Sequence, residues 1–130
     1  MKKQIIDTNE APKAASFFSQ AVLTNHPYLL ELSGQIGLNP ETMKLVDGGV
    51  KAETEQIFKN IQAILKSVGW SLDNITKVRV YLTNMNDYQA MNEVYAQKFI
   101  KKAPARVAIA VKELPLGAKV EIECNASGNI

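Results

Sequence analysis

The chain has 130 residues, of which 15 are Lys or Arg and 13 are Asp or Glu, so its formal net charge is +2. This length predicts a single domain, residues 1–130, which is large enough to bury a core without disulfides or a structural metal. The basic residues are dispersed among the acidic ones, which argues against a dedicated nucleic-acid surface, and the single Cys124 excludes an internal disulfide.

The beginning of the chain, residues 1–7, carries two lysines but no apolar run, so we expect no export signal. No apolar segment approaches the roughly 18 residues that a membrane span requires. Together with the lone cysteine, which we expect to be a small buried hydrophobe, these features predict a cytoplasmic protein that does not act at a membrane.

The first third of the chain has the pattern of strands. We expect strands at residues 4–6, 17–24 and 28–37, and the turn sequence Asn25-His26-Pro27 predicts that the last two form a hairpin. His26, beside a proline in this turn, is expected to be a surface residue rather than a catalytic base.

Two amphipathic helices enclose the next strand. The apolar period changes to that of a helix over residues 57–68, and Gly69 is expected to end this helix. Residues 75–83 then alternate as a strand. Asn86 is expected to cap a second helix, whose apolar stripe consists of Tyr88, Met91, Tyr95 and Phe99.

Residues 104–111 and 120–124 read as the last two strands, which we expect to pair as a closing hairpin. The predicted order is β-β-β-α-β-α-β-β, an α+β domain with a mixed sheet. The crossover rule for parallel strands would place both helices on one face of that sheet. The other face would remain apolar and uncovered, so we expect a symmetric homo-oligomer that buries it.

Arg106 is the most informative residue of these strands. It shares a strand face with Ala108 and Ala110, and its guanidinium stays charged, so it needs an anionic partner. One interpretation is a structural ion pair with Glu121 or Glu123 across the closing hairpin. The other is a fork that binds a substrate carboxylate, which the space beside Ala108 favours.

Other catalytic signatures are missing from the sequence. It has no phosphate-binding glycine-rich loop, and one His with one Cys is too few for a typical zinc site or a catalytic triad. Any chemistry must therefore use Arg, Glu, hydroxyls, backbone groups and water. Glu121 and Glu123 are candidates because they share one face of their strand.

Several motifs together resemble the RidA/YjgF family of reactive-intermediate deaminases. They are Pro104-Ala105-Arg106, the Val-Glu-Ile-Glu segment that begins at Val120, Leu32-Ser33-Gly34-Gln35, and Asn92. The similarity runs nearly end to end. It implies a chorismate-mutase-like α+β fold and a homotrimer with its sheets inside, its helices outside and three clefts between subunits.

The resemblance also implies a function. Members of the family hydrolyse 2-imino or enamine acids released by pyridoxal-phosphate dehydratases, such as 2-iminobutanoate and 2-iminopropanoate, to 2-keto acids and ammonia without a cofactor. This C–N hydrolase chemistry is linked to isoleucine biosynthesis. By the resemblance, Arg106 holds the substrate carboxylate and Glu121 activates water. Ser33 and Gly34 line the reacting end, and Asn92 closes the pocket.

Two positions depart from the family pattern. Ser16-Phe17-Phe18 stands where many members have Gly-Pro-Tyr, so Phe18 replaces a tyrosine and its hydroxyl is missing. Ala108 stands where a cysteine is common, which makes the pocket larger and less polar. An alternative function is therefore a non-catalytic regulatory protein that binds 2-keto acids. Ribonuclease and chorismate mutase functions have less support, because the lysines are dispersed and the chain has only two arginines.

Overall fold

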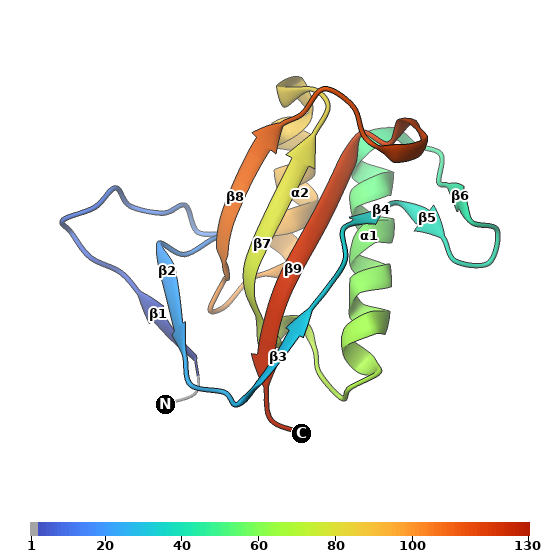
Figure 1. The fold of residues 1–130 in the computed structure, drawn as a ribbon. Helices are drawn as coiled ribbons and strands as arrows, with labels where there is room; N and C mark the ends of the chain where they lie inside the picture. The colour runs from blue at the N-terminus through green and yellow to red at the C-terminus, as the bar shows by residue number, and fades with distance from the viewer. Residues whose placement is uncertain (1–2) are drawn as a thin grey trace.

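A computed structural model describes residues 3–130 (Figure 1). The elements are β1 (Lys3–Ile6), β2 (Ala21–Thr24), β3 (Tyr28–Glu31), β4 (Gln35–Ile36), β5 (Leu38–Asn39), β6 (Lys44–Leu45), α1 (Gly49–Lys66), β7 (Ile75–Leu82), α2 (Tyr88–Lys98), β8 (Ala105–Ala110) and β9 (Val120–Gly128). This is the predicted order with short extra strands before α1. In the described part of the chain, no helix is long and apolar enough to cross a membrane. The structure does not describe residues 1 and 2, which belong to the segment 1–7 that we expected to lack an export signal.

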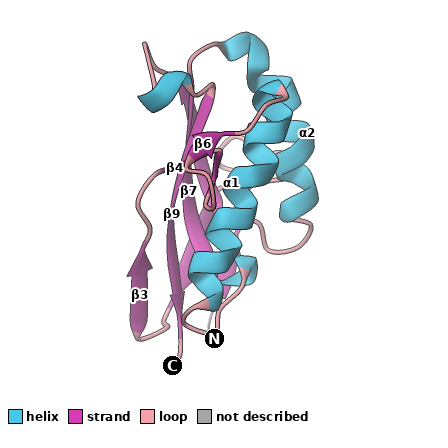
Figure 2. Cartoon of the chain, turned by 90° about the vertical axis from the view of Figure 1, so that its right-hand side faces the viewer, coloured by secondary structure: helices cyan, strands magenta, loops and turns pink. Residues whose placement is uncertain are grey.

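The main sheet has the order β3-β9-β7-β8, with β4 also pairing β9. Strands β7 and β8 are parallel and the other pairs are antiparallel, so the sheet is mixed. Both helices lie on the same face of this sheet (Figure 2). The predicted α+β class, with two helices on one face, is confirmed.

The core lies between the helices and the sheet. Ile57, Phe58 and Ile61 of α1 are fully buried against alternate residues of β7 and β9. The helix begins at Gly49, earlier than the apolar period indicated, after Gly48 with a φ of 114° that favours glycine. Cys124 is buried in this core as predicted, and burial raises the pKa of its thiol to about 12.

The predicted hairpin between residues 17–24 and 28–37 is wrong. Strand β2 pairs with β1, whereas β3 pairs with β9. The Gln20 side chain explains the first pairing, because it donates to the carbonyls of Thr8 and Pro12 at 3.0 and 2.8 Å and holds the intervening loop against β2. A turn sequence indicates where the chain reverses direction, but it does not determine which strands pair with each other.

The predicted closing hairpin is also wrong, because β7 lies between β8 and β9. Helix α2 returns the chain so that β8 runs parallel to β7, and the connection to β9 then passes across the end of β7. Main-chain hydrogen bonds fix this connection, from Val111 to Leu82 at 2.7 Å and from Thr83 to Lys119 at 3.2 Å. The buried Glu53 of α1 also accepts the Lys119 N–H at 2.8 Å.

No helix from the described part of the chain lies on the second face of the sheet, which is turned toward the viewer in Figure 1. Its centre is polar: Arg79 donates to Asn125 at 2.7 Å, and the Tyr81 hydroxyl donates to Glu123. Apolar side chains remain exposed toward both edges, including Leu29 (71%) and Ile109 (44%). The predicted uncovered face is therefore present, although its middle is polar rather than apolar.

Candidate active site

Arg106 projects from the edge strand β8 toward the helices. In the register of β7 and β8, Arg106 is the neighbour of Val78, and Ala108 is the neighbour of Val80. Both valines are fully buried under the helices, and residues side by side in adjacent strands point to the same face. Because β8 ends the sheet, the guanidinium lies where the helix layer meets the sheet edge.

Two side chains of α2 hold the guanidinium. Nη1 of Arg106 donates to Oδ1 of Asn92 at 2.5 Å, and Nη2 donates to the Tyr88 hydroxyl at 2.8 Å. The N-cap of α2 is Asp87 rather than the predicted Asn86, which lies in the 3₁₀ turn Met85–Asp87 that leads into the helix. Asn84 caps this turn, and its side chain accepts the N–H of Asn86. Tyr88 and Asn92 are four residues apart, so they share one helix face.

Aromatic rings surround the same guanidinium. Its Cζ atom lies 4.8 to 5.6 Å from four ring centroids, those of Phe17, Phe18, Tyr88 and Tyr95. Rings at this distance favour a cation electrostatically, but they do not neutralise its charge. Arg106 thus remains a cation in an aromatic environment.

The structural ion pair between Arg106 and Glu121 or Glu123, one of the two interpretations that the sequence left open, does not form. Among residues 3–130, the ion pairs join Lys13 to Asp7, Lys51 to Glu93, and Lys98 to Glu55. Glu121 and Glu123 lie on β9, beyond β7 and on the opposite face, where they are the partners of Tyr81 and Arg79. Within the described chain, the half-buried guanidinium therefore has no carboxylate.

The Glu121 side chain lies against Gly34, which follows Ser33 in the segment between β3 and β4. From Glu31 to Gln35 one strand advances by four residues, whereas its partner advances by three, from Asn125 to Ile122. The extra residue makes a β-bulge between β3 and β4. A Cβ built on Gly34 would lie 2.9 Å from Cδ of Glu121 and would also clash with its Oε2, so the carboxylate lies directly over this glycine.

We expect Gly34→Ala to displace the Glu121 carboxylate and to leave the fold intact, because the clash is with the end of a flexible side chain. If Glu121 activates water, as the resemblance implies, a misplacement of about 1 Å is expected to lower turnover of an imino acid by about 100-fold, which steady-state kinetics would measure. The control is the double variant with Glu121→Gln. If the methyl acts through the carboxylate, the double variant is no slower than Glu121→Gln alone, and additive losses would contradict this explanation.

The structure thus divides the predicted site residues into two clusters. Arg106, Asn92, Phe18 and Ala108 lie on the helix side of β8, whereas Ser33, Gly34 and Glu121 surround the bulge beside β9. Glu121 points to the uncovered face, because its partner in the register is Tyr81. Within a single chain, the side chains of Arg106 and Glu121 therefore cannot both contact the same small ligand.

Three aromatic contacts of Arg106 were not predicted as site residues. Tyr88 and Tyr95 were assigned to the apolar stripe of the second helix, and Phe17 was noted only beside Phe18. The helical spacing of Tyr88, Asn92 and Tyr95 was a usable signal, since these positions share one face. Tyr95 is fully buried, which raises the pKa of its hydroxyl, and no partner for that hydroxyl is found among residues 3–130.

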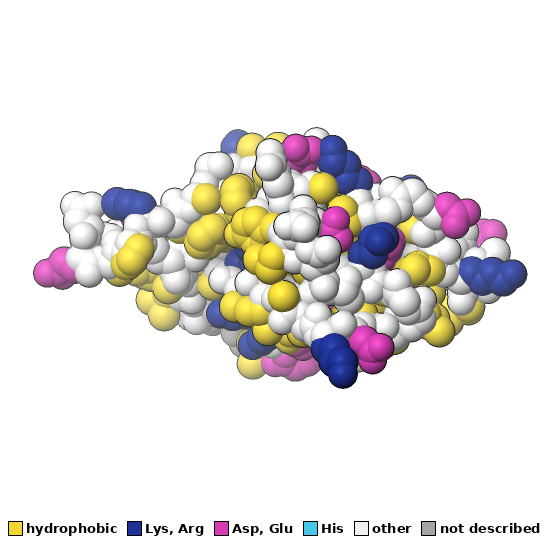
Figure 3. Space-filling view, turned by 90° about the horizontal axis from the view of Figure 1, so that it is seen from above, with side chains coloured by type: hydrophobic (Ala, Val, Ile, Leu, Met, Phe, Trp, Pro, Cys, Tyr) yellow, Lys and Arg dark blue, Asp and Glu magenta, His cyan; other side chains and the backbone are white. Residues whose placement is uncertain are grey.

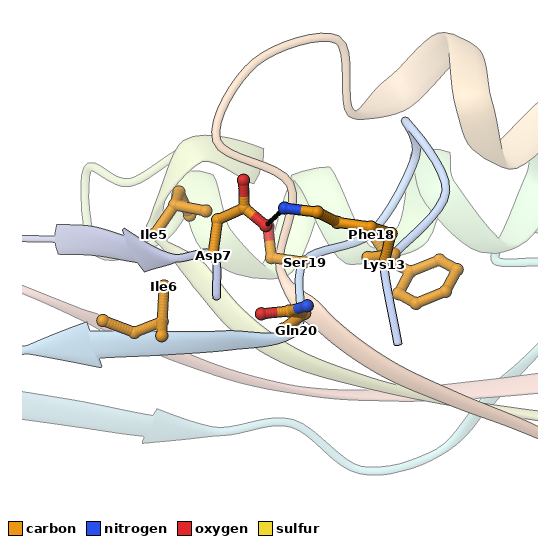
Figure 4. Close-up of a pocket in the computed structure, with 8 residues that line it drawn as sticks. Ile5, Ile6, Asp7, Lys13, Phe18, Ser19 and Gln20 are labelled. Carbon is orange, nitrogen blue, oxygen red and sulfur yellow. Dashed lines mark hydrogen bonds and ion pairs between the residues drawn. The ribbon is translucent and has the colours of Figure 1, made fainter. Parts of the chain in front are cut away.

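Phe18 is held beside Arg106 by the next residue. The Ser19 hydroxyl donates to the carbonyl of Ala103 at 2.5 Å, and its N–H donates to that of Pro104 at 3.0 Å. Phe18 also lines a cavity of about 230 Å³ (Figure 4). The cavity's other lining residues are Ile5, Ile6, Asp7, Lys13, Ala14, Ser19 and Gln20.

Among residues 3–130, no three His, Cys, Asp or Glu side chains gather where they could bind a metal ion.

The sequence model of the family described as Endoribonuclease L-PSP matches residues 8–127. The human 2-iminobutanoate/2-iminopropanoate deaminase is 42% identical over 124 residues, which are 95% of this chain and 89% of the human protein. The crystal structure of RidA from an Antarctic Psychrobacter has 42% identity, a TM-score of 0.73, and coverage of 95% of this chain and 98% of that one.

E. coli TdcF with bound serine has 34% identity and a TM-score of 0.71, with coverage of 95% of this chain and 98% of that one. These similarities extend over nearly the whole chain, as the motifs around Arg106 and Glu121 indicated. The chain therefore belongs to the Endoribonuclease L-PSP family, which is the family of the RidA/YjgF deaminases.

Proposed function

We propose that this protein is a deaminase that hydrolyses reactive 2-imino and enamine acids, such as 2-iminobutanoate and 2-iminopropanoate, to 2-keto acids and ammonia. The observation that carries the proposal is the half-buried Arg106 guanidinium, which is held by Asn92 and Tyr88 but has no carboxylate partner among residues 3–130. Relatives named as imine deaminases support the reaction, and bound serine in E. coli TdcF supports a small ligand with a carboxylate.

In the proposed mechanism, Arg106 binds the substrate carboxylate through paired N–H groups. Glu121 takes a proton from a water molecule as the water oxygen bonds to the iminium carbon. The protonated Glu121 then returns this proton to the nitrogen. Ammonia leaves as the new hydroxyl becomes the keto group, and Glu121, which is again a carboxylate, accepts the hydroxyl proton and passes it to the departing ammonia. Because the iminium carbon is already electrophilic, positioning and one general base supply the rate gain.

We further propose that the site forms between subunits of a homotrimer with its sheets inside. The Arg106 cluster of one chain would face the bulge and Glu121 of its neighbour. Two features support this arrangement: the two clusters lie on opposite faces of one chain, and apolar residues such as Leu29 and Ile109 are exposed on the uncovered face. A closed symmetric assembly would bury that face.

Mixing two inactive variants tests this arrangement. If Arg106→Ala and Glu121→Gln chains are unfolded together and refolded at equal amounts, random trimers would have both groups intact in about one quarter of their sites. We expect imine hydrolysis to return to about that fraction of wild type, since one chain supplies Arg106 and its neighbour supplies Glu121. The unmixed variants, refolded in the same way, are the controls. No recovery in mixtures that form trimers would contradict a shared site.

A non-catalytic protein that binds 2-keto acids is the second candidate, favoured by the missing hydroxyl at Phe18. A coupled assay separates the two: threonine dehydratase supplies the imine, semicarbazide competes for it, and keto acid release is followed. The deaminase proposal requires wild type to accelerate release and Glu121→Gln to lose this effect. If both have no effect while 2-ketobutyrate still binds, the regulatory function is supported.

The family description names an endoribonuclease, but the charges of this chain favour a small metabolite. Acidic and basic side chains are interspersed over the end of the molecule seen in Figure 3 rather than separated by sign. RNA-binding surfaces concentrate Lys and Arg on one face. We therefore propose a small 2-imino or 2-keto acid as ligand and no nucleic-acid partner.

A further inference from the structure

We propose that the hydroxyl of Tyr88 binds the ligand's carboxylate beside Arg106, as a second type of donor in the same half of the site. The inference rests on the proposed carboxylate site and assigns it a residue that the sequence pattern placed in the apolar stripe of α2. It also gives a physical reason why the site tolerates Phe18, which lacks the hydroxyl of the tyrosine that many family members have at this position.

The direction of one hydrogen bond carries the inference. Nη2 of Arg106 donates to the Tyr88 oxygen at 2.8 Å, so that oxygen is the acceptor and keeps its own hydrogen free to donate. Among residues 3–130, the structure has no acceptor for this hydrogen. A hydroxyl that accepts from a cation is polarised and becomes a better donor, which suits a carboxylate ligand.

Arg106 and Tyr88 are also fixed relative to each other. A guanidinium has five N–H donors, and here Asn92 and Tyr88 accept one from each Nη atom. The acceptors lie one turn apart on α2, so the helix sets the orientation of the guanidinium plane. The unused N–H groups and the Tyr88 hydroxyl therefore form one preorganised set of donors for an anion.

Of the two tyrosines beside Arg106, Tyr88 and Tyr95, it is Tyr88 that is partly accessible to solvent. Tyr95 has its ring centroid 4.8 Å from Cζ of Arg106, but its side chain is fully buried. Tyr88 is half-buried, and its ring centroid lies 5.6 Å from the same atom. The Phe18 ring lies at 5.3 Å and has no hydroxyl. Two rings thus flank one cation at similar distances, and the polar group is on Tyr88.

The ring-conserving variant Tyr88→Phe tests the inference. We expect the dissociation constant for 2-ketobutyrate, measured by calorimetry, and the KM for the imine to rise about tenfold, with kcat within about threefold of wild type, because one hydrogen bond to a charged group is lost. Binding of the neutral amide of 2-ketobutyrate should change little. Tyr28→Phe, which alters an exposed tyrosine of β3, is the matched control.

Rescue separates a missing hydroxyl from a disturbed structure. We expect the double variant Tyr88→Phe with Phe18→Tyr to regain most of the affinity, because a hydroxyl returns on the neighbouring ring. The inference would be overturned if Tyr88→Phe bound 2-ketobutyrate as tightly as wild type. It would also be overturned if Tyr88→Phe lost affinity and the double variant did not regain it. In both cases wild type still binds and turns over, so the proposed function stands. Wild type that neither binds nor hydrolyses would contradict the proposed function itself.

Discussion

Arg106→Ala is expected to abolish measurable binding of 2-ketobutyrate while the protein stays folded and assembled. Removing one partner of a buried, hydrogen-bonded charge pair costs about 2–5 kcal/mol of binding free energy. Calorimetry would measure the loss of binding, and light scattering the assembly. The fold should tolerate the change, because Arg106 forms no ion pair with a carboxylate within residues 3–130.

Two controls make this result specific. Arg106→Lys keeps the charge but loses the planar fork, so its affinity should lie between those of wild type and Arg106→Ala. Lys51→Ala removes one positive charge from an exposed ion pair between the helices and should bind normally. Unfolding or dissociation of Arg106→Ala, with Lys51→Ala unaffected, would instead assign the guanidinium a structural role.

Glu121→Gln is expected to lower turnover by about 10²–10⁴-fold, the usual contribution of a general base. Binding of 2-ketobutyrate should remain within about threefold of wild type, because the amide has the same shape and, in the proposed mechanism, Arg106 holds the carboxylate. Steady-state imine hydrolysis and calorimetry with the keto acid measure the two effects separately.

Glu123→Gln is the matched control, since Glu123 lies two residues along the same strand face. Its carboxylate accepts a hydrogen bond from the Tyr81 hydroxyl, which raises the pKa of Tyr81. We expect this variant to retain turnover. Equal losses in both variants would show that negative charge on this face, rather than a base at Glu121, supports the reaction.

The alternation of residues along each strand predicted much of this arrangement. It placed Arg106 on one face with Ala108, and Glu121 on one face with Glu123, because side-chain direction has a fixed period of two. The pairing of strands was not predictable in the same way. Hairpins were expected from neighbours in sequence, whereas β7 separates β8 from β9 through contacts that are distant in the chain.

The candidate site shows the same limit. Motifs identified Arg106 and Glu121 individually, but their separation onto opposite faces depends on the register with β7. The bulge at Gly34 becomes visible only when both strands are aligned, because it is a difference in residue count between them. The helical spacing places Tyr88 on the face of Asn92, but its contact with Arg106 joins a helix to an edge strand and depends on how α2 packs against β8.

The central position of β7 also has a consequence for the order in which the chain folds. The contacts of Arg106 with α2 lie within residues 75–110, a compact β-α-β unit with short loops. Gly34 and Glu121, in contrast, are 121 − 34 = 87 residues apart. Contacts close in sequence form faster than distant ones. The half that we propose to bind the anion can therefore form while the chain is being synthesised, whereas the carboxylate proposed to activate water takes its place only when the last strand emerges.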